Sequence, residues 1–425
     1  MKIEVRHLTR IEGHAHLIVD LDAGEVRDCR LEVVESPRFF EGMLVGRHIN
    51  DVAAIVARIC GVCSNSHTLV SLAASEAAMG IEISNQTKRL RRLLAYGEIL
   101  QSHLLQLYFM AIPDYLGVNS ILPLAKTRRD LVSRALRLKK MANTLCQCIG
   151  GRAVHPVTLR PGGFATLPTP AALQAVRKEM VAALPDLEAT VDLFLSLPVH
   201  PFERETEYFS LAPESGYPLF GEQLISSDGV DLPVQDFRDG VKEYLVPHST
   251  AKFARLTRNE FMVGPLARYK NGAARLSPMA KQVSKALGLT LETVNPYHAL
   301  RARLVEVVHC VEEAIHLIDE TLINGLSDET PAFDIKEGRG CAAVEAPRGT
   351  LFHCYEYDES GCIIKADCII PTGQNLGNIE ADLRALVPQL LELPREEMTL
   401  RLEALVRAYD PCISCSTHLL KIDFV

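Results

Sequence analysis

The sequence predicts an α+β protein that is mainly α-helical, with a bundle of long helices and small β elements near the N- and C-terminal regions. Two patterns in its 425 residues predict this class. Long segments place apolar residues at helical spacing, and shorter segments near both ends alternate between apolar and polar residues. Because no internal repeat, low-complexity segment or linker separates these regions, we expect residues 1–425 to form a single interwoven domain.

The β elements are predicted from alternation bounded by turn residues. Gly13 and Gly24 mark turns near the N-terminus, and near the C-terminus a β-hairpin is expected around residues 358–361. The predicted strands are residues 2–7, 15–20, 25–34, 340–357 and 361–370.

The helices are predicted from apolar periodicity between start and stop signals. Asn50 is a candidate N-cap, and Gly80 ends the helix that begins there. The predicted helices are residues 50–79, 85–110, 127–149, 170–197, 296–323, 378–393 and 395–409. Residues 199–251 are rich in Pro, Gly and Ser and are expected to form an irregular surface excursion with short strands.

Composition and charge restrict the class of function. The chain is 48% hydrophobic and 23% charged, values ordinary for a soluble globular protein. Its net charge is −8, and its basic cluster, residues 88–92, falls on a predicted helix, where a solvated face or a subunit contact is expected. We therefore expect no nucleic-acid partner. No apolar stretch reaches the ~18 residues of a membrane span, so no span is predicted.

Two CxxC pairs, Cys60–Cys63 and Cys412–Cys415, stand out among the twelve cysteines. Chance supplies only about 0.3 such pairs in a chain of this composition. Each pair is followed by a histidine at nearly the same offset, His67 and His418. A four-thiolate site built from both pairs would bring the two ends of the chain together in the interior.

The spacing alone leaves the metal open. Four thiolates suit zinc, iron–sulfur or nickel, and a structural zinc site is the simplest alternative. Structural zinc sites usually lie in small loop-rich modules, whereas the first pair here falls within a long apolar run predicted to be helical, residues 52–78.

Together with the segments around them, these pairs resemble a known family, the large catalytic subunits of nickel–iron hydrogenases. Three motifs carry most of the resemblance: Leu-Thr-Arg-Ile-Glu-Gly-His at 8–14, Arg-Ile-Cys-Gly-Val-Cys-Ser-Asn-Ser-His at 58–67, and Asp-Pro-Cys-Ile-Ser-Cys-Ser-Thr-His at 410–418. Further matching segments are residues 150–156, 162–164, 263–268, 345–349 and 371–372. Because the order matches from residue 8 to 418, the resemblance covers nearly the whole chain.

The resemblance implies a Ni–Fe centre that splits or makes H2. In the family all four cysteines bind nickel, so Cys60 and Cys412 would be terminal ligands. Cys63 and Cys415 would also bridge to an iron that carries one CO and two cyanides, an Fe(CN)2(CO) unit. Thiolates donate enough charge to let nickel change its redox state.

The resemblance also implies roles for residues around the centre. Glu12 matches the proton-transfer glutamate, with a surface acid as the alternative role. Arg348 matches the arginine above the open metal site, and Asp114 and Asp410 match the carboxylates that pair with it; an ordinary surface ion pair is the alternative for Arg348. Residues expected to line the pocket of the diatomic ligands are Pro347, Leu351, Ile370, Pro371 and Thr372, although hairpin core is nearly as good an interpretation for Leu351 and Ile370.

A magnesium ion is implied as well. Glu41 falls where the family has a carboxylate ligand, His418 where it has a histidine ligand, and a backbone carbonyl near Cys368 would be a third. A solvated surface acid is the alternative for Glu41.

The match departs from the family in two places. The Ser-His-x-x-His motif appears as residues 102–106 with Gln106 in place of the second histidine, which puts a secondary proton or packing role in doubt. In the family a protease usually removes a tail after the position of His418, and here residues 419–425 are a possible cleavable tail.

Electrons must leave through a partner, because the other eight cysteines show no iron–sulfur spacing and are expected to be mostly small buried hydrophobic residues. The resemblance implies an obligate iron–sulfur small subunit, together with further flavin or iron–sulfur subunits. The Cys412–His418 ending resembles the cytosolic multisubunit type, so a cytoplasmic location is expected, while the electron acceptor stays open.

Two other functions stay open from the sequence. A quinone-site subunit related to complex I shares the expected fold, but such relatives have generally lost the four cysteines. A hydrogen sensor or zinc-stabilised scaffold would keep the cysteines and show no significant turnover.

Overall fold

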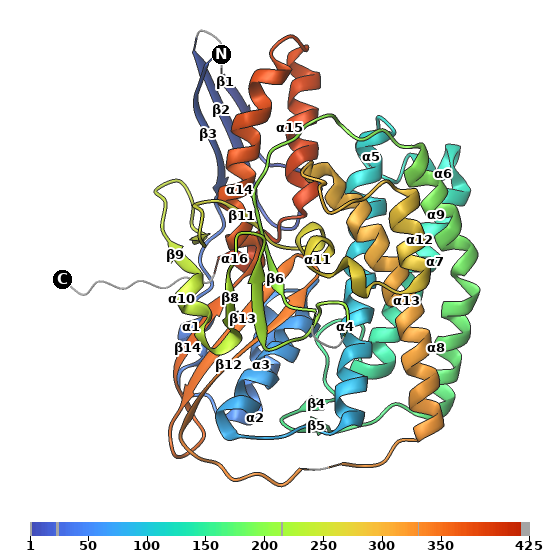
Figure 1. The fold of residues 1–425 in the computed structure, drawn as a ribbon, viewed down its shortest axis with the longest axis vertical. Coiled ribbons are helices and arrows are strands. Elements are labelled where there is room, and N and C mark those ends of the chain that lie inside the picture. The colour runs from blue at the N-terminus through green and yellow to red at the C-terminus, as the bar shows by residue number, and fades with distance from the viewer. Residues whose placement is uncertain (1, 23–24, 214–215, 330, 418–425) are drawn as a thin grey trace, which may run out of the picture.

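Long helices pack side by side along one flank of the molecule, and small sheets occupy the other flank (Figure 1). The structure is a computed structural model, and it describes residues 2–22, 25–213, 216–329 and 331–417. The predicted class, α+β with mainly helical content, is confirmed. In the described part of the chain, no helix combines the length and the apolar character needed to cross a bilayer.

The helical flank is built from long helices with shorter ones between them. They are α4 (Asn85–Leu105), α5 (Ile112–Tyr115), α6 (Leu124–Thr127), α7 (Arg129–Gly150), α8 (Pro170–Ala182), α9 (Leu184–Ser196), α12 (Pro278–Ala286) and α13 (Ala299–Asn324). Helix α4 packs against both α7 and α13. It begins where the Ser84 hydroxyl accepts a hydrogen bond from the Thr87 N–H at 3.0 Å, which caps the helix.

The largest sheet of the other flank is an antiparallel meander covered by one helix. Its strands are β12 (Gly338–Ala346), β13 (Gly349–Tyr357) and β14 (Ile363–Ile369), and α3 (Ser64–Met79) packs across β12 and β13. The backbones approach so closely that a Cβ atom at Gly340 would lie 2.2 Å from the Ala74 carbonyl oxygen. Glycine at this position therefore lets α3 lie against the sheet.

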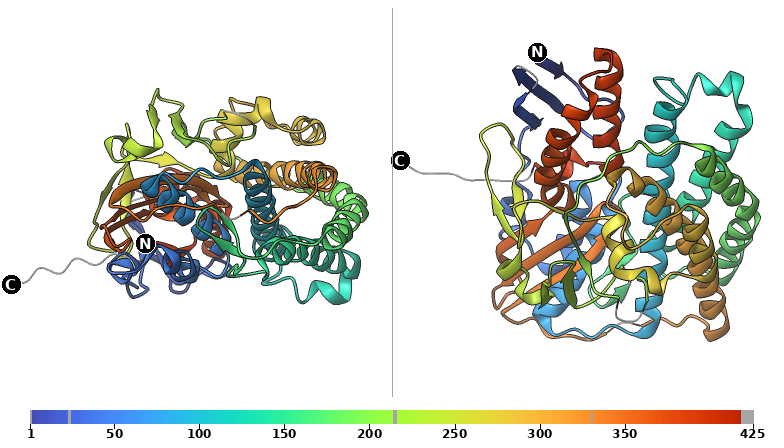
Figure 2. Two further views of the ribbon diagram at one scale, coloured as in Figure 1. Left: turned by 90° about the horizontal axis from the view of Figure 1, so that it is seen from below. Right: turned by 45° about the horizontal axis from the view of Figure 1, so that its top comes forward.

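The N-terminal sheet and the helices near the C-terminus lie side by side (Figure 2). The N-terminal sheet of β1 (Lys2–Val5), β2 (Ala15–Asp22) and β3 (Glu25–Val33) packs against α14 (Pro371–Leu386). Helices α15 (Arg395–Tyr409) and α16 (Ile413–Ser416) follow α14, and α1 (Phe40–Leu44) and α2 (Ile49–Val56) follow the N-terminal sheet. This arrangement brings the segments before and after each CxxC pair into the same region.

The middle of the chain forms short strands, as predicted, and its first strand is buried, whereas most residues from 221 to 250 are partly or fully exposed. Strand β6 (Glu207–Leu211) is buried along its whole length and pairs with β7 (Gln223–Ser226) and β11 (Phe261–Met262). Phe209 and Leu211 of β6 belong to the apolar cluster that includes Phe352 of β13, so this packing holds the strand in the interior. The other elements here are β4 (Leu159–Arg160), β5 (Gly163–Phe164), β8 (Asp231–Pro233), α10 (Phe237–Gly240), β9 (Lys242–Tyr244), β10 (Phe253–Arg255) and α11 (Pro265–Gly272).

Several predicted elements are divided in the structure. The helix expected over 50–79 ends at Val56, passes through a 3₁₀ turn, and restarts at Ser64 after a loop that holds the first CxxC pair. The helix expected over 170–197 breaks at Ala183, because Pro185 starts a new helix. The strand expected over 340–357 is divided into β12 and β13.

A disulfide corrects the expectation for two of the other cysteines. Cys341 on β12 and Cys354 on β13 face each other in register and are joined by a disulfide bond. They are therefore not free hydrophobic side chains. Their separation of 13 residues follows no motif, so only the strand pairing identifies them as partners.

Candidate metal centre

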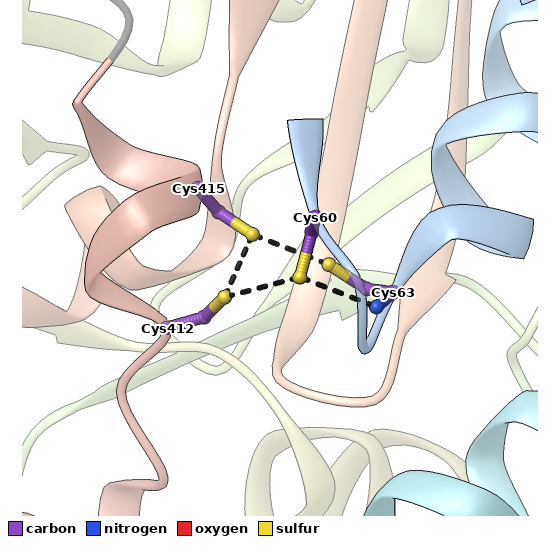
Figure 3. A group of neighbouring side chains, drawn as sticks. All are labelled: Cys60, Cys63, Cys412 and Cys415. Carbon is purple, nitrogen blue, oxygen red and sulfur yellow. Dashed lines mark hydrogen bonds between the residues drawn. The ribbon is translucent and has the colours of Figure 1, made fainter. Parts of the chain in front are cut away.

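Four cysteines from the two ends of the chain meet in the interior (Figure 3). The sulfur atoms of Cys60 and Cys412 lie 3.5 Å apart, those of Cys63 and Cys415 3.3 Å, and those of Cys412 and Cys415 2.7 Å. All four sulfur atoms lie within 4.8 Å of one another, and all four residues are buried. The predicted convergence of the two pairs on one site is confirmed.

The first pair lies in a tight loop between α2 and α3. Cys60 follows the 3₁₀ turn Ala57–Ile59 in an extended conformation, and Cys63 directly precedes the first residue of α3. The backbone N–H groups of Val62 and Cys63 donate to the Cys60 sulfur atom at 3.2 and 3.4 Å. The loop therefore presents both sulfur atoms toward the second pair and supplies donors that stabilise a thiolate.

The second pair lies at the short helix α16. Asp410 adopts a left-handed conformation, with φ of 56°, and ends α15 just before Cys412. The Cys412 N–H donates to the Thr372 hydroxyl at 2.9 Å, which ties the pair to the start of α14. The hydroxyl of Ser416 donates to the Cys412 carbonyl at 3.1 Å and holds the turn that brings Cys415 beside Cys412.

Two N-terminal segments join the cysteine loops. The Ile413 N–H donates to the Glu12 carbonyl at 2.9 Å, as in a short parallel bridge. The Arg38 guanidinium donates to the Ile59 carbonyl at 2.6 Å and also to the Ser414 carbonyl. Arg38 thus connects the residue before Cys60 with the residue before Cys415. Sequence reasoning missed Arg38, because it lies outside the matching motifs.

The pKa values of the cysteine thiols at this site shift in opposite directions. Hydrogen bonding from the Cys412 thiol lowers the pKa of Cys60 well below its usual value. Burial raises the pKa values of Cys412 and Cys415 well above theirs. Because metal ligands must be thiolates, occupation of this site releases protons into the interior.

Glu12 lies where it can accept such a proton. The Cys412 thiol donates to the Glu12 carboxylate at 3.1 Å. The Ser414 N–H donates to the same carboxylate oxygen at 3.1 Å, and the Ser414 hydroxyl donates to the other oxygen. Glu12 is therefore not a purely solvated surface acid, because its carboxylate contacts a candidate ligand atom directly.

Arg348 lies at the turn between β12 and β13. Its Nε donates to the Asp410 carbonyl at 2.7 Å and one Nη donates to the Asp410 carboxylate at 3.0 Å. Burial by itself lowers the pKa of Arg348, but the charges of Asp410 and the cysteines raise it well above its usual value. The predicted pairing with Asp410 is thus present, and the guanidinium stays charged.

The predicted pairing of Asp114 with Arg348 is wrong. Asp114 instead accepts hydrogen bonds from Arg407 at 2.8 and 2.9 Å, and from Arg10. Arg407 lies on α15 and also donates to the Thr9 carbonyl at 2.9 Å. These contacts hold the N-terminal segment that leads to Glu12, so Asp114 acts on the site through a different arginine.

Arg348 is among the residues that line a small cavity beside three of the cysteines, Cys63, Cys412 and Cys415. Four of the five predicted pocket residues line it: Leu351, Ile370, Pro371 and Thr372. Pro347 lies outside this lining, and its carbonyl oxygen accepts from Arg268 at 3.1 Å. Among the described residues, the buried Nη1 atom of Arg348 has no hydrogen-bond partner, so it is free to donate to a polar ligand.

The candidate magnesium ligands are only partly described. The Glu41 carboxylate accepts from the Cys368 N–H at 3.0 Å, which places the predicted carboxylate beside the predicted backbone segment. The Lys252 ammonium lies 3.5 Å from the same carboxylate. The third predicted ligand, His418, and the possible tail 419–425 lie outside the described residues.

A buried glutamate near the first pair was also missed. Glu98 on α4 accepts hydrogen bonds from the N–H groups of Asn65 at 2.6 Å and Ser66 at 2.9 Å, at the start of α3. Burial raises the pKa of Glu98 to about 7. A single acidic residue on the buried face of a predicted helix is the signal that could have found it.

Replacing Glu98 by glutamine is expected to change how stability depends on pH. The pKa of Glu98 is about 7 in the folded protein and 4.5 for an ordinary glutamate, so the folded state holds an extra proton between these values. This contribution is complete below pH 4.5 and is lost as pH rises through 7. Relative to Glu98→Gln, the wild-type free energy of unfolding should fall by roughly 2–3 kcal/mol between pH 5 and pH 8.

Urea unfolding of the metal-free protein at both pH values measures this difference. The exposed Glu188 on α9, replaced by glutamine, is the matched control and should leave the pH dependence unchanged. An equal offset between wild type and Glu98→Gln at pH 5 and pH 8 would show that Glu98 does not hold the extra proton.

The sequence matches a family model described as nickel-dependent hydrogenase over residues 38–133 and 237–418, and one described as HoxL-like over residues 2–36. It is 34% identical to the alpha chain of sulfhydrogenase 1 of Pyrococcus furiosus, over 99% of both chains. It is 31% identical to a subunit of the F420-non-reducing hydrogenase vhu of Methanocaldococcus jannaschii, over 89% of this chain and 97% of that one.

The fold agrees with these matches. A crystal structure of an NAD+-reducing NiFe hydrogenase in the H2-reduced state superposes with a TM-score of 0.89 at 26% identity, covering 98% of this chain and 99% of that one. The chain therefore belongs to the nickel-dependent hydrogenase family. Within that family it is the large catalytic subunit, which makes it an oxidoreductase, and its four clustered cysteines fit a Ni–Fe centre.

Proposed function

We propose that this chain is the catalytic subunit of a cytoplasmic, multisubunit hydrogenase in which Glu12 carries protons to and from the metal centre. The observation that carries this proposal is the hydrogen bond from the Cys412 thiol to the Glu12 carboxylate at 3.1 Å. Cys60, Cys63, Cys412 and Cys415 would hold nickel, and Cys63 and Cys415 would also hold iron. The bound centre supplies the redox chemistry of heterolytic H2 cleavage.

The protein supplies the path of the proton. Cys412 Sγ holds the proton released at the site, and the carboxylate of Glu12 receives it across the existing hydrogen bond. The hydrogen bonds from Ser414 hold the carboxylate in this position, so proton transfer needs little reorientation of the side chain. In the reverse direction, Glu12 returns the proton to Cys412 for H2 formation.

The cavity beside the sulfur atoms would hold an Fe(CN)2(CO) unit. The apolar side chains of Leu351 and Ile370 suit CO, which forms no strong hydrogen bonds. The unpartnered Nη1 of Arg348 is a donor that suits the nitrogen of one cyanide, and Thr372 is a second polar group in the lining. Magnesium would bind Glu41, the carbonyl of Cys368 and His418, supported by the contact between Glu41 and the Cys368 backbone.

Electrons would pass to a small subunit with iron–sulfur clusters, and from there to flavin or further iron–sulfur subunits. The relatives support this assembly because each is named as one subunit of its hydrogenase. We propose that residues 1–425 act as one interwoven domain in it. The retained four cysteines favour this function over that of a quinone-site subunit.

Elemental analysis, infrared spectroscopy and H2-driven dye reduction of the purified complex test the proposal together. Nickel near one atom per catalytic subunit, iron well above one atom because the iron–sulfur subunits add their clusters, bands from bound CO and cyanide, and dye reduction under H2 are expected. Zinc as the only bound metal would overturn it in favour of a structural site. Nickel and infrared bands without turnover would indicate a hydrogen sensor.

A further inference from the structure

Two buried arginines outside the metal site donate hydrogen bonds to backbone carbonyls next to that site. The first is Arg268 on α11, which has no exposed surface. Its guanidinium uses all five N–H donors. Three reach the carboxylates of Glu306, at 2.7 Å twice, and Glu345, at 3.0 Å; the other two reach the carbonyl oxygens of Ala346 at 2.9 Å and Pro347 at 3.1 Å. These two carbonyls directly precede Arg348.

The second is Arg303 on α13, which is 1% exposed. It donates to the carbonyl oxygens of Ala408 at 2.5 Å and Tyr409 at 2.9 Å, the last residues of α15. These two carbonyls directly precede Asp410. Each arginine therefore holds two carbonyls before one partner of the Arg348–Asp410 pair.

The two arginines are connected through helix α13 and its residue Glu306. Glu306 forms the bidentate pair with Arg268 and lies on the same helix as Arg303, three residues further along, so both groups project from one region of α13. Glu306 also accepts from the Tyr217 hydroxyl at 2.7 Å and bonds to His103 at 2.7 Å. Its position is thus determined by four contacts.

The burial of these charges calls for a reason beyond stability. Burying an ion pair is at best weakly stabilising, because desolvation offsets the attraction. Here three arginines, at 268, 303 and 348, are balanced by three carboxylates, at 306, 345 and 410, in the interior beside the four cysteines. A planar guanidinium fork can hold carboxylate and carbonyl groups at the same time, which a lysine ammonium cannot do with the same geometry.

We propose that Arg268 and Arg303 are positioning residues that fix the Arg348–Asp410 pair beside the four cysteines. This inference rests on the proposed function, in which Arg348 faces the bound ligands. Without these hydrogen bonds from Arg268 and Arg303, which we call the clamps, the turn that carries Arg348 and the end of α15 that carries Asp410 could move independently. The Arg348 guanidinium would then lose its position at the cavity.

The test compares Arg268→Lys and Arg303→Lys with a matched control, Arg91→Lys. Arg91 is also buried, forms a bidentate pair with Glu76 at 2.7 and 2.6 Å, and donates to the Arg160 carbonyl. In the described part of the chain, none of its hydrogen bonds reaches the turn before Arg348 or the end of α15. The readouts are activity per nickel, the positions of the infrared bands of CO and cyanide, and the Arg348 position in crystals of the metal-free proteins.

Both clamp variants are expected to lose up to roughly 100-fold in activity per nickel, because small displacements at a reacting site are costly. Their infrared bands should shift in the direction seen for Arg348→Lys, and the Arg268→Lys/Arg348→Lys double variant should be no worse than Arg348→Lys alone. In Arg91→Lys, activity per nickel and band positions should stay at wild-type values, with only stability reduced.

Wild-type activity per nickel and unshifted bands in the clamp variants would overturn the proposal and leave a structural role. If Arg268→Lys does not fold, Glu345→Gln, which weakens one contact of Arg268, should give a smaller shift in the same direction; no shift would equally overturn it. If the wild type holds no nickel, the proposed function fails. The crystals of the metal-free proteins still test the positioning role, because an Arg348 that has not moved in the Arg268→Lys and Arg303→Lys variants contradicts it.

Discussion

Cys412→Ser is expected to lose nickel and H2 oxidation together. Structural zinc sites with four protein ligands in zinc-finger peptides bind with roughly 10–16 kcal/mol, so the loss of one of four ligands here should weaken metal binding at least roughly 100-fold. A serine hydroxyl is a harder ligand and is not ionised at neutral pH, so it does not replace the thiolate. Cys412 also donates to Glu12, and the same change therefore removes the first step of the proton path.

Nickel per chain by elemental analysis, together with H2-dependent dye reduction, measures this loss. Cys148→Ser is the matched control, since Cys148 is a free, half-buried cysteine on α7 away from the site. Full nickel content and activity in Cys412→Ser would show that the four sulfur atoms do not share one metal centre.

Glu12→Gln is expected to lower turnover by roughly 100- to 10,000-fold, the range that a positioned acid or base contributes. Glutamine keeps the size of the side chain and can still accept from the Ser414 N–H, but it cannot carry a proton at neutral pH. Nickel content should stay at the wild-type value, because the glutamate contacts the ligand thiol without being a ligand itself.

Turnover with H2 and isotope exchange between H2 and D2O measure this effect. Glu35→Gln is the matched control, because Glu35 lies next to the same segment and accepts from the His14 N–H at 2.9 Å without contacting Cys412. Unchanged turnover in Glu12→Gln, at wild-type nickel content, would show that the proton leaves by another route.

Local features of this fold could be predicted from the sequence. Helix α15 spans residues 395–409 as predicted, because its apolar spacing and its boundary residues are local signals. The helix predicted over 50–79 fails for the opposite reason. Both cysteines of the loop at Cys60–Cys63 are buried, so the apolar pattern continues through it and hides the break.

The candidate site divides in the same way. The four cysteines were found because two CxxC pairs are rare and each has a local geometry. Asp114 was assigned to the wrong arginine, because the residues next to a carboxylate in the sequence do not indicate which distant arginine it will pair with. Arg38, Arg268 and Arg303 were missed as functional residues for that reason too: each bonds to carbonyl oxygens near the site, and every residue has a carbonyl oxygen.

Residue order and spacing are thus enough to identify the class of protein, the positions of most long helices and the four thiols that fit the metal centre. These features depend on periodicity and on motifs, which act over a few residues. Only the folded chain shows that its two ends meet, that Glu12 bonds to Cys412 across 400 positions, and that buried arginines hold the turns around Arg348. Such contacts join segments far apart in the chain, so they exist only after the helices and sheets have packed.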